Sequence, residues 1–324
     1  MDLMKILAEK AKARFCRVVY PEATDSKIVE AARIAVTRGI ARPILLGSAE
    51  KITSSGIDLT GMEVINPKTS TNVQKYAEAY AESECFPVST MSKMLLEPLY
   101  YAAMMIRTGD ADAMVAGLTH TTEEVILASE MLVGMVDGVS TPSSFFIMHV
   151  PDWDGGEDGL IVFADCAVVT NPSVQELAEI AITTASSVRG LLGWEPRVAM
   201  LSFSTKGSGT HPDVDKIVEA VSIARQRDPG LLIDGEMQAD SAIVASVAAK
   251  KIKGGSKVGG RANILIFPDL DAGNIGYKLV QRLAKAAAYG PVLQGFARPV
   301  SDLSRGASVD DIVGVTTIVG ARTT

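Results

Sequence analysis

The chain has 324 residues, 47% of them hydrophobic, and carries a formal net charge of −7. Because this length exceeds what one hydrophobic core usually fills, we expect two domains. The acidic balance, without any basic run or stripe, excludes a protein that binds nucleic acid through its phosphates.

The distribution of apolar and cysteine residues bears on where the protein works. No apolar run approaches the roughly 20 residues of a membrane span, and the first residues lack the apolar core of a secretion signal. The three cysteines, Cys16, Cys85 and Cys166, are odd in number and widely spaced, which is typical of a reducing compartment. We therefore predict a soluble cytoplasmic protein without a membrane partner.

The first half of the chain alternates amphipathic helices with short apolar strands. This rhythm is typical of a parallel α/β sheet, whose buried strands are apolar throughout. Asp25 is placed to cap one helix, and Thr121 or Thr122 to cap another. We expect helices at 4–13, 26–38, 72–83, 90–107 and 122–134, and strands at 17–21, 43–46, 62–65 and 145–150. Residues 109–117 are expected to form a turn that leads into a further strand.

The second half repeats this pattern after Pro151–Gly159, the most polar and glycine-rich tract of the chain. Such a tract indicates a hairpin or a domain hinge. We expect strands at 160–164, 197–203, 231–234, 262–267 and 292–297, and helices at 172–190, 213–227, 240–250 and 274–288, followed by a C-terminal helix.

Four strand-to-helix junctions carry small polar residues. In α/β sheets, ligands bind beyond the carboxyl ends of the strands, so these junctions are the candidate binding loops. They are Gly117–Thr122, Ser202–Gly209, Pro268–Gly273 and the segment that starts at Ser301.

The loop Ser204–Gly209 has two interpretations. Its serine, lysine and glycine residues can bind a phosphoryl group through N–H groups and the Lys206 charge, although it is not a Walker loop. It can equally be a flexible surface turn. The sequence leaves both open.

Other chemical signals are weak. Asp234 and Glu236 stand at a strand end, where a helix cap or a hydrogen-bond anchor is a simpler role than paired-carboxylate catalysis. His120 lies at a junction, where it can touch a ligand, whereas we interpret His149 as structural. With His211, these histidines show no metal-ligand spacing, so we predict no metal site. No serine triad or activated cysteine is indicated.

The most concentrated polar cluster is Ser301–Asp311, which is followed directly by an apolar run. It brings together Ser304, Arg305 and three carboxylates. Ser308 and Asp311 have the spacing of a helix start. The cluster is either a helix cap, the edge of a site, or both.

Several segments, in order along nearly the whole chain, resemble the phosphate acetyltransferase family of the phosphate acetyl/butyryltransferase superfamily. They are Tyr20-Pro21-Glu22, Val198–Ser208, Asp234-Gly235-Glu236-Met237-Gln238, Phe267–Lys278 and Asp302-Leu303-Ser304-Arg305-Gly306.

The resemblance implies two three-layer α/β domains with a cleft between them, similar to the isocitrate and isopropylmalate dehydrogenases. The expected domain boundaries are 1–148 with 298–324 for the first domain, and 149–297 for the second. In this architecture the C-terminal segment returns to the first domain.

The resemblance also implies reversible acetyl transfer between acetyl phosphate and coenzyme A, by direct thiolate attack in a ternary complex. Carried over by position, Asp311 is the base for the thiol proton, Arg305 stabilises charge on the acyl phosphate, and Ser304 hydrogen-bonds the reacting centre. The implied substrate-binding residues are Thr121, Thr122, Ser204, Lys206, Asn274, Tyr277 and Lys278.

These residue types suit the chemistry. A thiol with a pKa of about 8.5 facing an Asp with a pKa of about 3.9 implies an uphill proton transfer of roughly 6 kcal/mol. Burial of Asp311 would raise its pKa, and the Arg305 guanidinium would lower that of the thiol. Arginine also binds phosphoryl oxygens in a bidentate manner, so no metal is required.

Two positions depart from the family. Leu127 stands where the family has an arginine on the phosphate, and Glu82–Cys85 stands where a second arginine is expected. Each lost charged hydrogen bond is equivalent to roughly 1.5–3 kcal/mol. Two alternatives therefore stand beside the acetyltransferase: a propionyl- or butyryl-specific phosphate acyltransferase, and a catalytically reduced homologue that binds coenzyme A. A metal-dependent dehydrogenase on the same scaffold is disfavoured, because no aspartate set has metal spacing.

The expected partners are small molecules: coenzyme A as a substrate rather than a tightly bound cofactor, acyl phosphate and phosphate. A homodimer is expected from the family. Apolar helical segments such as Ile180–Val188 can serve as its interface or pack inside the protein.

Overall fold

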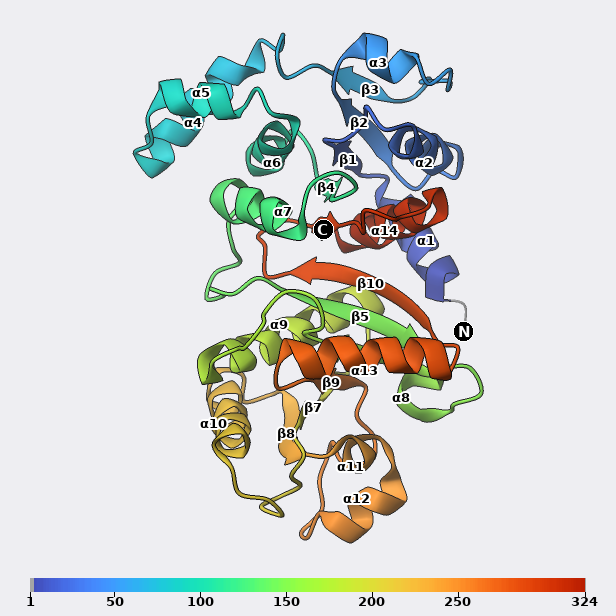
Figure 1. The fold of residues 1–324 in the computed structure, drawn as a ribbon, viewed down its shortest axis with the longest axis vertical. Helices are drawn as coiled ribbons and strands as arrows, with labels where there is room; N and C mark the ends of the chain where they lie inside the picture. Colours follow the sequence, from blue (N-terminus) through green and yellow to red (C-terminus); the bar gives the residue numbers. More distant parts are fainter. Residues whose placement is uncertain (1–2, 324) are drawn as a thin grey trace. The chain divides into compact units, whose positions relative to one another are not determined.

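The structure is a computed structural model that describes residues 3–323. The chain forms two compact units (Figure 1). We call them the terminal unit, residues 3–136 with 296–323, and the middle unit, residues 137–295. The division falls after residues 136 and 295, whereas the sequence prediction placed it after 148 and 297. The strand predicted at 145–150 consequently belongs to the middle unit.

The terminal unit is built on a five-stranded sheet in the order β11-β4-β1-β2-β3. Every neighbouring pair is parallel, as the alternating pattern predicts. Its strands are β1 (Arg17–Tyr20), β2 (Arg42–Leu46), β3 (Glu63–Ile65), β4 (Ala113–Ala116) and β11 (Val300–Asp302). Its helices are α1 (Leu3–Arg14), α2 (Ser26–Thr37), α3 (Ala49–Thr53), α4 (Asn72–Glu84), α5 (Val88–Met94), α6 (Pro98–Thr108), α7 (Thr122–Ala128), the π-helix η1 (Ser129–Val133) and α14 (Val309–Arg322).

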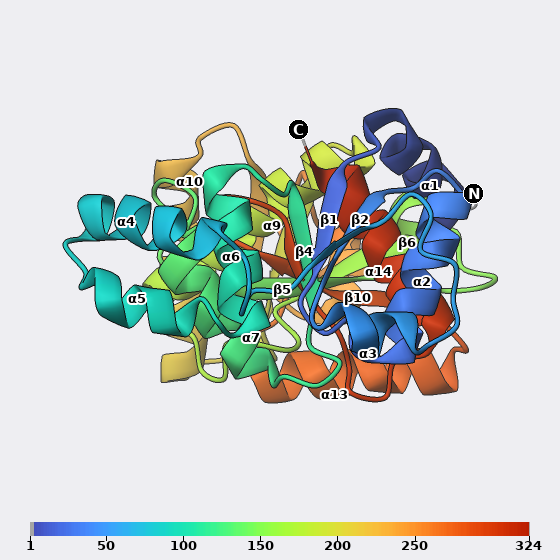
Figure 2. The same cartoon turned by 90° about the horizontal axis from the view of Figure 1, so that it is seen from above.

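Helices cover both faces of this sheet. In Figure 2, α6 lies on one side of β4 and β1, and α14 and α2 lie on the other. The buried side of α14 includes Ile312, Val313 and Ile318. Tyr20, at the end of β1, is fully buried and shares a 2.9 Å hydrogen bond with Thr316 Oγ1 of α14. The C-terminal helix is therefore part of the core of this unit.

The middle unit contains a six-stranded sheet in the order β10-β5-β6-β9-β7-β8. Its strands are β5 (Ser143–His149), β6 (Leu160–Ala164), β7 (Arg197–Leu201), β8 (Leu232–Met237), β9 (Ile264–Ile266) and β10 (Ala287–Gln294). Its helices are α8 (Gly155–Asp158), α9 (Val174–Leu192), α10 (Pro212–Arg227), α11 (Ala239–Ile243), α12 (Ala245–Lys251) and α13 (Leu270–Leu283).

This second sheet is mixed rather than parallel. Strands β10, β5 and β6 pair antiparallel, while β6, β9, β7 and β8 are parallel neighbours. The tract Pro151–Gly159 is thus the connection of the β5–β6 hairpin, the first of its two predicted roles. Helix α13 lies along one face, where Tyr277 and Val280 pack on the core, and α9 packs on the other face (Figure 1).

The helix caps predicted at Asp25 and Thr121 are confirmed, and Ser173 caps α9 in the same way. Asp25 accepts the Lys27 N–H at 2.8 Å. Thr121 and Ser173 each form a capping box with the glutamate three positions later. In each case a short side chain satisfies an N–H group that has no partner within the helix.

Four local predictions were wrong, and one strand was not predicted. The helix expected at 90–107 is broken at Glu97, because Pro98 begins α6 and cannot continue α5. The helix at 240–250 is likewise broken, at Val244, where the backbone is extended. The predicted helix 122–134 is α-helical only to Ala128 and continues as η1. Residues 287–288, predicted helical, begin the edge strand β10, and β11 was not foreseen at all.

Candidate active site

The terminal unit brings two of the predicted junctions to the same edge of its sheet. Strands β4 and β11 are parallel neighbours, with Asp302 opposite Ala116. The junction Gly117–Thr122 leaves the end of β4, and the loop 303–308 leaves the end of β11. Because parallel strands share their carboxyl ends, these two segments form one candidate site within this unit.

Glu22 organises the β4 junction. Its side chain is only 1% exposed, and it accepts the N–H groups of Leu118, Thr119 and His120 at 2.7–2.8 Å. The Thr119 hydroxyl and His120 Nδ1 also contact Glu22 Oε1, each at 2.8 Å. Burial alone would raise the pKa of Glu22, but these hydrogen bonds outweigh it and lower the pKa to about 2. The backbone donors of this junction therefore bind an internal carboxylate.

His120 is the ring partner of Glu22. The hydrogen bond to Glu22 raises the pKa of His120 against the smaller effect of desolvation, and the charges of Glu22, Glu124 and Glu97 act in the same direction. The ring is 30% exposed. Among the residues that the structure describes, its only hydrogen-bond partner is Glu22, through the backbone N–H and Nδ1. Nε2 is thus left available to a ligand.

A second buried carboxylate, Asp302, joins the two segments. Thr122 Oγ1 donates to its Oδ2 at 2.5 Å, while its Oδ1 is buried without a partner among the described residues. Burial raises the pKa of Asp302 to about 6. Gly117, with φ +106°, is required here, because a Cβ at this position would lie 2.0 Å from Asp302 Oδ1.

The loop after β11 exposes the predicted catalytic residues Ser304 and Arg305. Ser304 Oγ accepts the Gly306 N–H at 3.3 Å, and Lys27 of α2 donates to the Ala307 carbonyl at 3.2 Å. Arg305 forms no ion pair within residues 3–323, although its charge acts on Glu124 of α7. The loop therefore presents a hydroxyl and a guanidinium that are free to meet an anionic ligand.

Asp311 begins α14 rather than lying in a buried pocket. Its Oδ2 accepts the Ser308 N–H at 2.9 Å and the Ser308 hydroxyl at 2.7 Å, which completes a capping box. Asp311 is exposed, so the burial expected from the chemistry is absent. The cap uses only one carboxylate oxygen, and Oδ1 has no partner among the described residues.

The remaining predicted residues of the terminal unit are held by internal contacts. The Thr121 hydroxyl accepts the Glu124 N–H at 3.1 Å as the cap of α7. The Thr122 hydroxyl is bound to Asp302, as described above. Their roles in substrate binding stay predictions.

In the middle unit, the loop Ser204–Gly209 wraps around Glu236, which is 3% exposed. Ser204 Oγ and the Gly207 N–H both donate to Glu236 Oε1, at 2.9 and 2.7 Å. Lys206 Nζ binds Asp234 Oδ1 and the Gly235 carbonyl, each at 2.6 Å. The groups expected to cradle a phosphate thus contact protein oxygens here.

Three predicted substrate-binding residues, Asn274, Tyr277 and Lys278, lie in the middle of α13. Asn274 Nδ2 donates to the Cys166 carbonyl at 3.1 Å. Tyr277 stacks on Phe146 with ring centroids 4.3 Å apart, and the ammonium of exposed Lys278 lies 5.7 Å from the Tyr277 ring. Of these side chains, Lys278 is the most accessible to a ligand.

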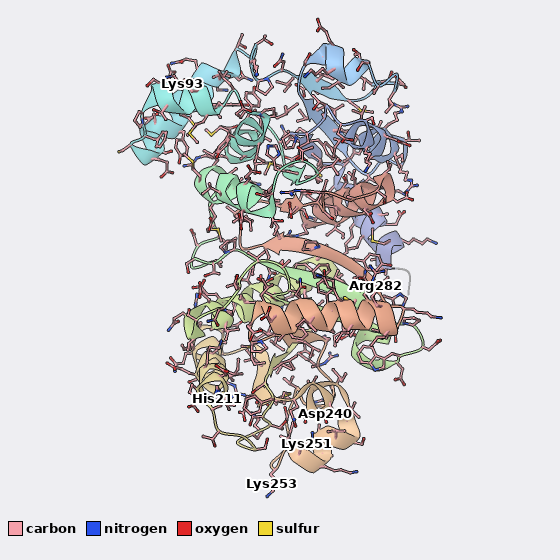
Figure 3. The ribbon with its side chains drawn as sticks, viewed as in Figure 1. Lys93, His211, Asp240, Lys251, Lys253 and Arg282 are labelled. Carbon is pink, nitrogen blue, oxygen red and sulfur yellow. The ribbon has the colours of Figure 1, made fainter. Side chains whose placement is uncertain are left out.

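Two open cavities, of about 600 and 520 Å³, lie in the middle unit, and both are lined by Lys206 and Arg225. Arg225 binds Asp234 Oδ1 at 2.9 Å, so both cations share one carboxylate. Lys253 lines the smaller cavity and lies close to the ion pair of Lys251 with Asp240 (Figure 3). None of the other predicted site residues lines these cavities.

Glu22 and Asp302 were not predicted to organise the site. Glu22 and Asp302 were named only within segments that resemble the family, and Asp302 also as one carboxylate of the polar cluster. A signal existed for Glu22, because it follows a strand that ends at Pro21 and so lies at the carboxyl edge of the sheet. Nothing local indicated that Thr122 and Asp302, 180 residues apart, would meet.

Within residues 3–323, no group of three or more His, Cys, Asp or Glu residues is arranged to hold a metal ion. In the same range, no helix combines the length and apolarity required to cross a membrane.

Comparison with known proteins identifies the family. Residues 2–320 match the family model described as phosphate acetyl/butaryl transferase. The phosphate acetyltransferase of Thermoanaerobacterium thermosaccharolyticum is 46% identical over 329 residues, covering 99% of this chain and 100% of that protein.

Solved structures agree with this result. A phosphotransacetylase from Streptococcus pyogenes superposes with a TM-score of 0.92 at 39% identity, covering 99% of this chain and 97% of the other. A 4-hydroxythreonine-4-phosphate dehydrogenase from Klebsiella pneumoniae, with a TM-score of 0.53 at 11% identity over 94% of this chain and 98% of the other, shares the fold alone. The chain therefore belongs to the phosphate acetyl/butaryl transferase family.

Proposed function

We propose that this protein is a phosphate acetyltransferase, which transfers the acetyl group between acetyl phosphate and coenzyme A in a ternary complex. The thiolate sulfur attacks the acetyl carbon, a C–S bond forms, and the bond from that carbon to the phosphate oxygen breaks. The thiol proton goes to the base, and inorganic phosphate leaves. The observation that carries this proposal is the exposed Ser304–Arg305 loop beside Asp311, in a chain of this family.

Asp311 is the proposed base. Its Oδ1 has no described partner, so it can accept the thiol proton while Oδ2 keeps the cap with Ser308. Because Asp311 is exposed in the free protein, its own desolvation must come from bound coenzyme A, which would raise its pKa in the complex. The Arg305 guanidinium favours the thiolate and so reduces the remaining difference between the pKa values of the thiol and Asp311.

Arg305 and Ser304 are proposed to act on the acyl phosphate. The unpaired guanidinium can bind two phosphoryl oxygens, and the Ser304 hydroxyl can donate to the oxygen on which charge develops. Donors placed where charge develops stabilise the transition state more than the ground state.

The first test is thioester formation from acetyl phosphate and coenzyme A by the purified full-length protein. We expect turnover that falls about a hundredfold in Ser304→Ala and at least as far in Asp311→Asn, as for loss of an oxyanion donor or a general base. Turnover no greater than that of the double variant Ser304→Ala/Asp311→Asn would contradict the proposal.

The two alternatives are outcomes of the same experiment. Faster turnover of propionyl or butyryl phosphate than of acetyl phosphate would favour the longer-chain transferase. Calorimetric binding of coenzyme A without any turnover would favour the reduced homologue. The relatives at 40–46% identity are named phosphate acetyltransferases, which supports the acetyl substrate.

The proposed binding residues of the middle unit, Ser204, Lys206, Asn274, Tyr277 and Lys278, form a separate group. We propose Lys278 as a contact for a phosphate of coenzyme A, because its ammonium is exposed. Lys278→Gln should raise the KM for coenzyme A and leave that for acetyl phosphate unchanged.

We further propose a homodimer in the cytoplasm. All three cysteines are free, which fits a reducing compartment. Ile180 and Val188 are buried within the middle unit, which supports the packing role for these two side chains of the predicted segment. Sedimentation analysis of the full chain tests the oligomeric state directly.

A further inference from the structure

The cations available at the β4 junction are few. Helix α7 begins with Glu123 and Glu124 and carries no lysine or arginine, and Leu127 on the same helix is 57% exposed. A phosphoryl group at this edge of the sheet would meet Arg305 from the β11 loop. The one other cationic group at the junction itself is the ring of His120.

The structure fixes the position of this ring, and the contact with a buried carboxylate favours its charged form. His120 is held twice by the same oxygen, because its backbone N–H and its Nδ1 both contact Glu22 Oε1 at 2.8 Å. Glu22 is buried and receives three further donors, so it stays anionic. Nδ1 must then carry a proton toward Glu22, and in the imidazolium Nε2 is a donor as well.

Nε2 has no partner among residues 3–323, and the ring is 30% exposed. The residue after next, Thr122, is bound to Asp302, which lies two residues before Ser304. The imidazolium and the Ser304–Arg305 loop are thus tied to one pair of neighbouring strands. A fixed cation with one free N–H, at the edge where anionic substrates are expected, is a phosphate-binding group.

We propose that His120 binds a phosphoryl group of the substrate, donating a hydrogen bond from Nε2 to a phosphoryl oxygen of the acyl phosphate. This inference rests on the proposed acyl transfer. It assigns the buried Glu22 a functional consequence, since Glu22 keeps the ring charged and oriented. His120 is a binding residue here, and Glu22 is its positioning residue.

Several charged groups face the ring and set its titration. Glu22 contacts it directly, Glu124 approaches from α7, and Glu97 from the start of α6. All three favour the imidazolium. The charge of Arg305 acts on Glu124 and offsets part of that negative charge. The ring is therefore charged below its raised pKa and loses its affinity for phosphate as pH rises through that pKa.

The kinetic test compares His120→Gln with the wild type and with the matched control His149→Gln in the middle unit. Loss of one charged hydrogen bond should raise the KM for acetyl phosphate about tenfold, with a smaller change in kcat. His120→Lys, which restores a cation, should recover part of this loss. The KM ratio of His120→Gln to wild type should shrink as pH rises, and taking the ratio cancels the ionisation of the phosphate itself.

A second measurement does not depend on turnover. The chain has three histidines, so single glutamine variants assign each ring C–H resonance in the NMR spectrum. Inorganic phosphate added to the full chain should shift the His120 titration to higher pH and leave that of His149 unchanged. Coenzyme A added alone distinguishes the other phosphate source, and the proposal requires the larger effect from inorganic phosphate.

The outcomes are separable. Wild-type protein without turnover would overturn the proposed function, and the NMR titration would still decide the role of His120. Turnover with an unchanged KM in His120→Gln, or a His120 resonance that ignores phosphate, would overturn the inference. If His120→Gln fails to fold, judged by its thermal transition, the titration of the wild type alone decides.

Discussion

Two junction loops of this protein bind their backbone N–H groups to a buried glutamate, but they differ in how their basic side chain is used. The loop 117–122 wraps around Glu22 in the terminal unit, and the loop 204–209 wraps around Glu236 in the middle unit. In both, N–H groups of a predicted binding loop bind an internal carboxylate. An internal carboxylate satisfies these donors in the free protein, because buried N–H groups without a partner are costly.

The loops differ in what happens to their cation. The Lys206 ammonium donates hydrogen bonds to Asp234 and to the Gly235 carbonyl. His120 offers one ring nitrogen to Glu22 and keeps the other without a described partner. A loop rich in glycine, hydroxyl and basic residues is therefore not sufficient evidence for a ligand site. A cationic side chain with a donor that no protein group occupies is the more informative feature.

The largest effect is expected from removing the carboxylate at the terminal junction. The pKa of Glu22 is lowered from 4.5 to about 2, so the ionised carboxylate stabilises the folded state at pH values above 4.5. This stabilisation is lost as the pH falls from about 4.5 toward about 2. Glu22→Gln should lower the free energy of unfolding at pH 7 by about 3 kcal/mol, because the side chain is nearly inaccessible to water. Urea unfolding measures this.

Glu236→Gln is the matched variant in the other loop, where two donors rather than five meet the carboxylate. Glu236→Gln should lower the free energy of unfolding by roughly 1.5 kcal/mol, about half the effect of Glu22→Gln. Equal losses in the two variants would remove the distinction between the junctions.

Asp302→Asn should act in the opposite direction. Burial raises the pKa of Asp302 from 3.8 to about 6, so the protein loses stability as pH rises through this interval, and the loss stays constant at higher pH. The variant should be more stable than the wild type by up to about 3 kcal/mol at pH 8, with little difference below pH 4. Thermal unfolding at several pH values measures this, and a gain that does not depend on pH would contradict it.

Leu127→Arg sharpens the comparison by supplying the terminal junction with a second cation. Leu127 is 57% exposed on α7, so the substitution should not disturb the core. We expect the KM for acetyl phosphate to fall about tenfold, as one added charged hydrogen bond predicts. Leu127→Gln serves as the uncharged control, and an equal fall with glutamine would show that charge is not the cause.

Lys206→Met should have the smallest effect on substrate binding. Because the ammonium is bound to Asp234 and Gly235, we expect the KM for acetyl phosphate to change by less than about twofold. The free energy of unfolding should fall by about 1 kcal/mol as Asp234 loses a partner that is only one-third exposed. A large rise in KM would instead support the phosphate-cradling role first considered for this loop.

Much of the fold was predictable because its signals are local. Strand and helix spans follow from apolar periodicity, and the caps at Asp25, Thr121 and Ser173 follow from side chains that reach N–H groups one turn away. The errors occurred where tertiary structure outweighs local preference. Residues 287–288 have helical composition, but β10 gains its hydrogen bonds from β5.

The candidate site was predictable only in its composition. Ser304, Arg305 and Asp311 stand out as a cluster, and the Ser308–Asp311 spacing predicts the start of α14. The exposure of Asp311 was not predictable, because the polar cluster did not reveal whether another segment would cover it.

The sequence by itself determined the order of the elements, their caps and the family. Only the tertiary structure decided which donors Glu22 receives from residues 96 positions away, and that Asp302 meets Thr122. These pairs depend on the order of β1, β4 and β11 in the sheet, which no local pattern specifies. These contacts also make His120 available to a ligand. The hydrogen bond from Nδ1 to Glu22 favours the charged form of the ring and leaves Nε2 without a partner among the described residues.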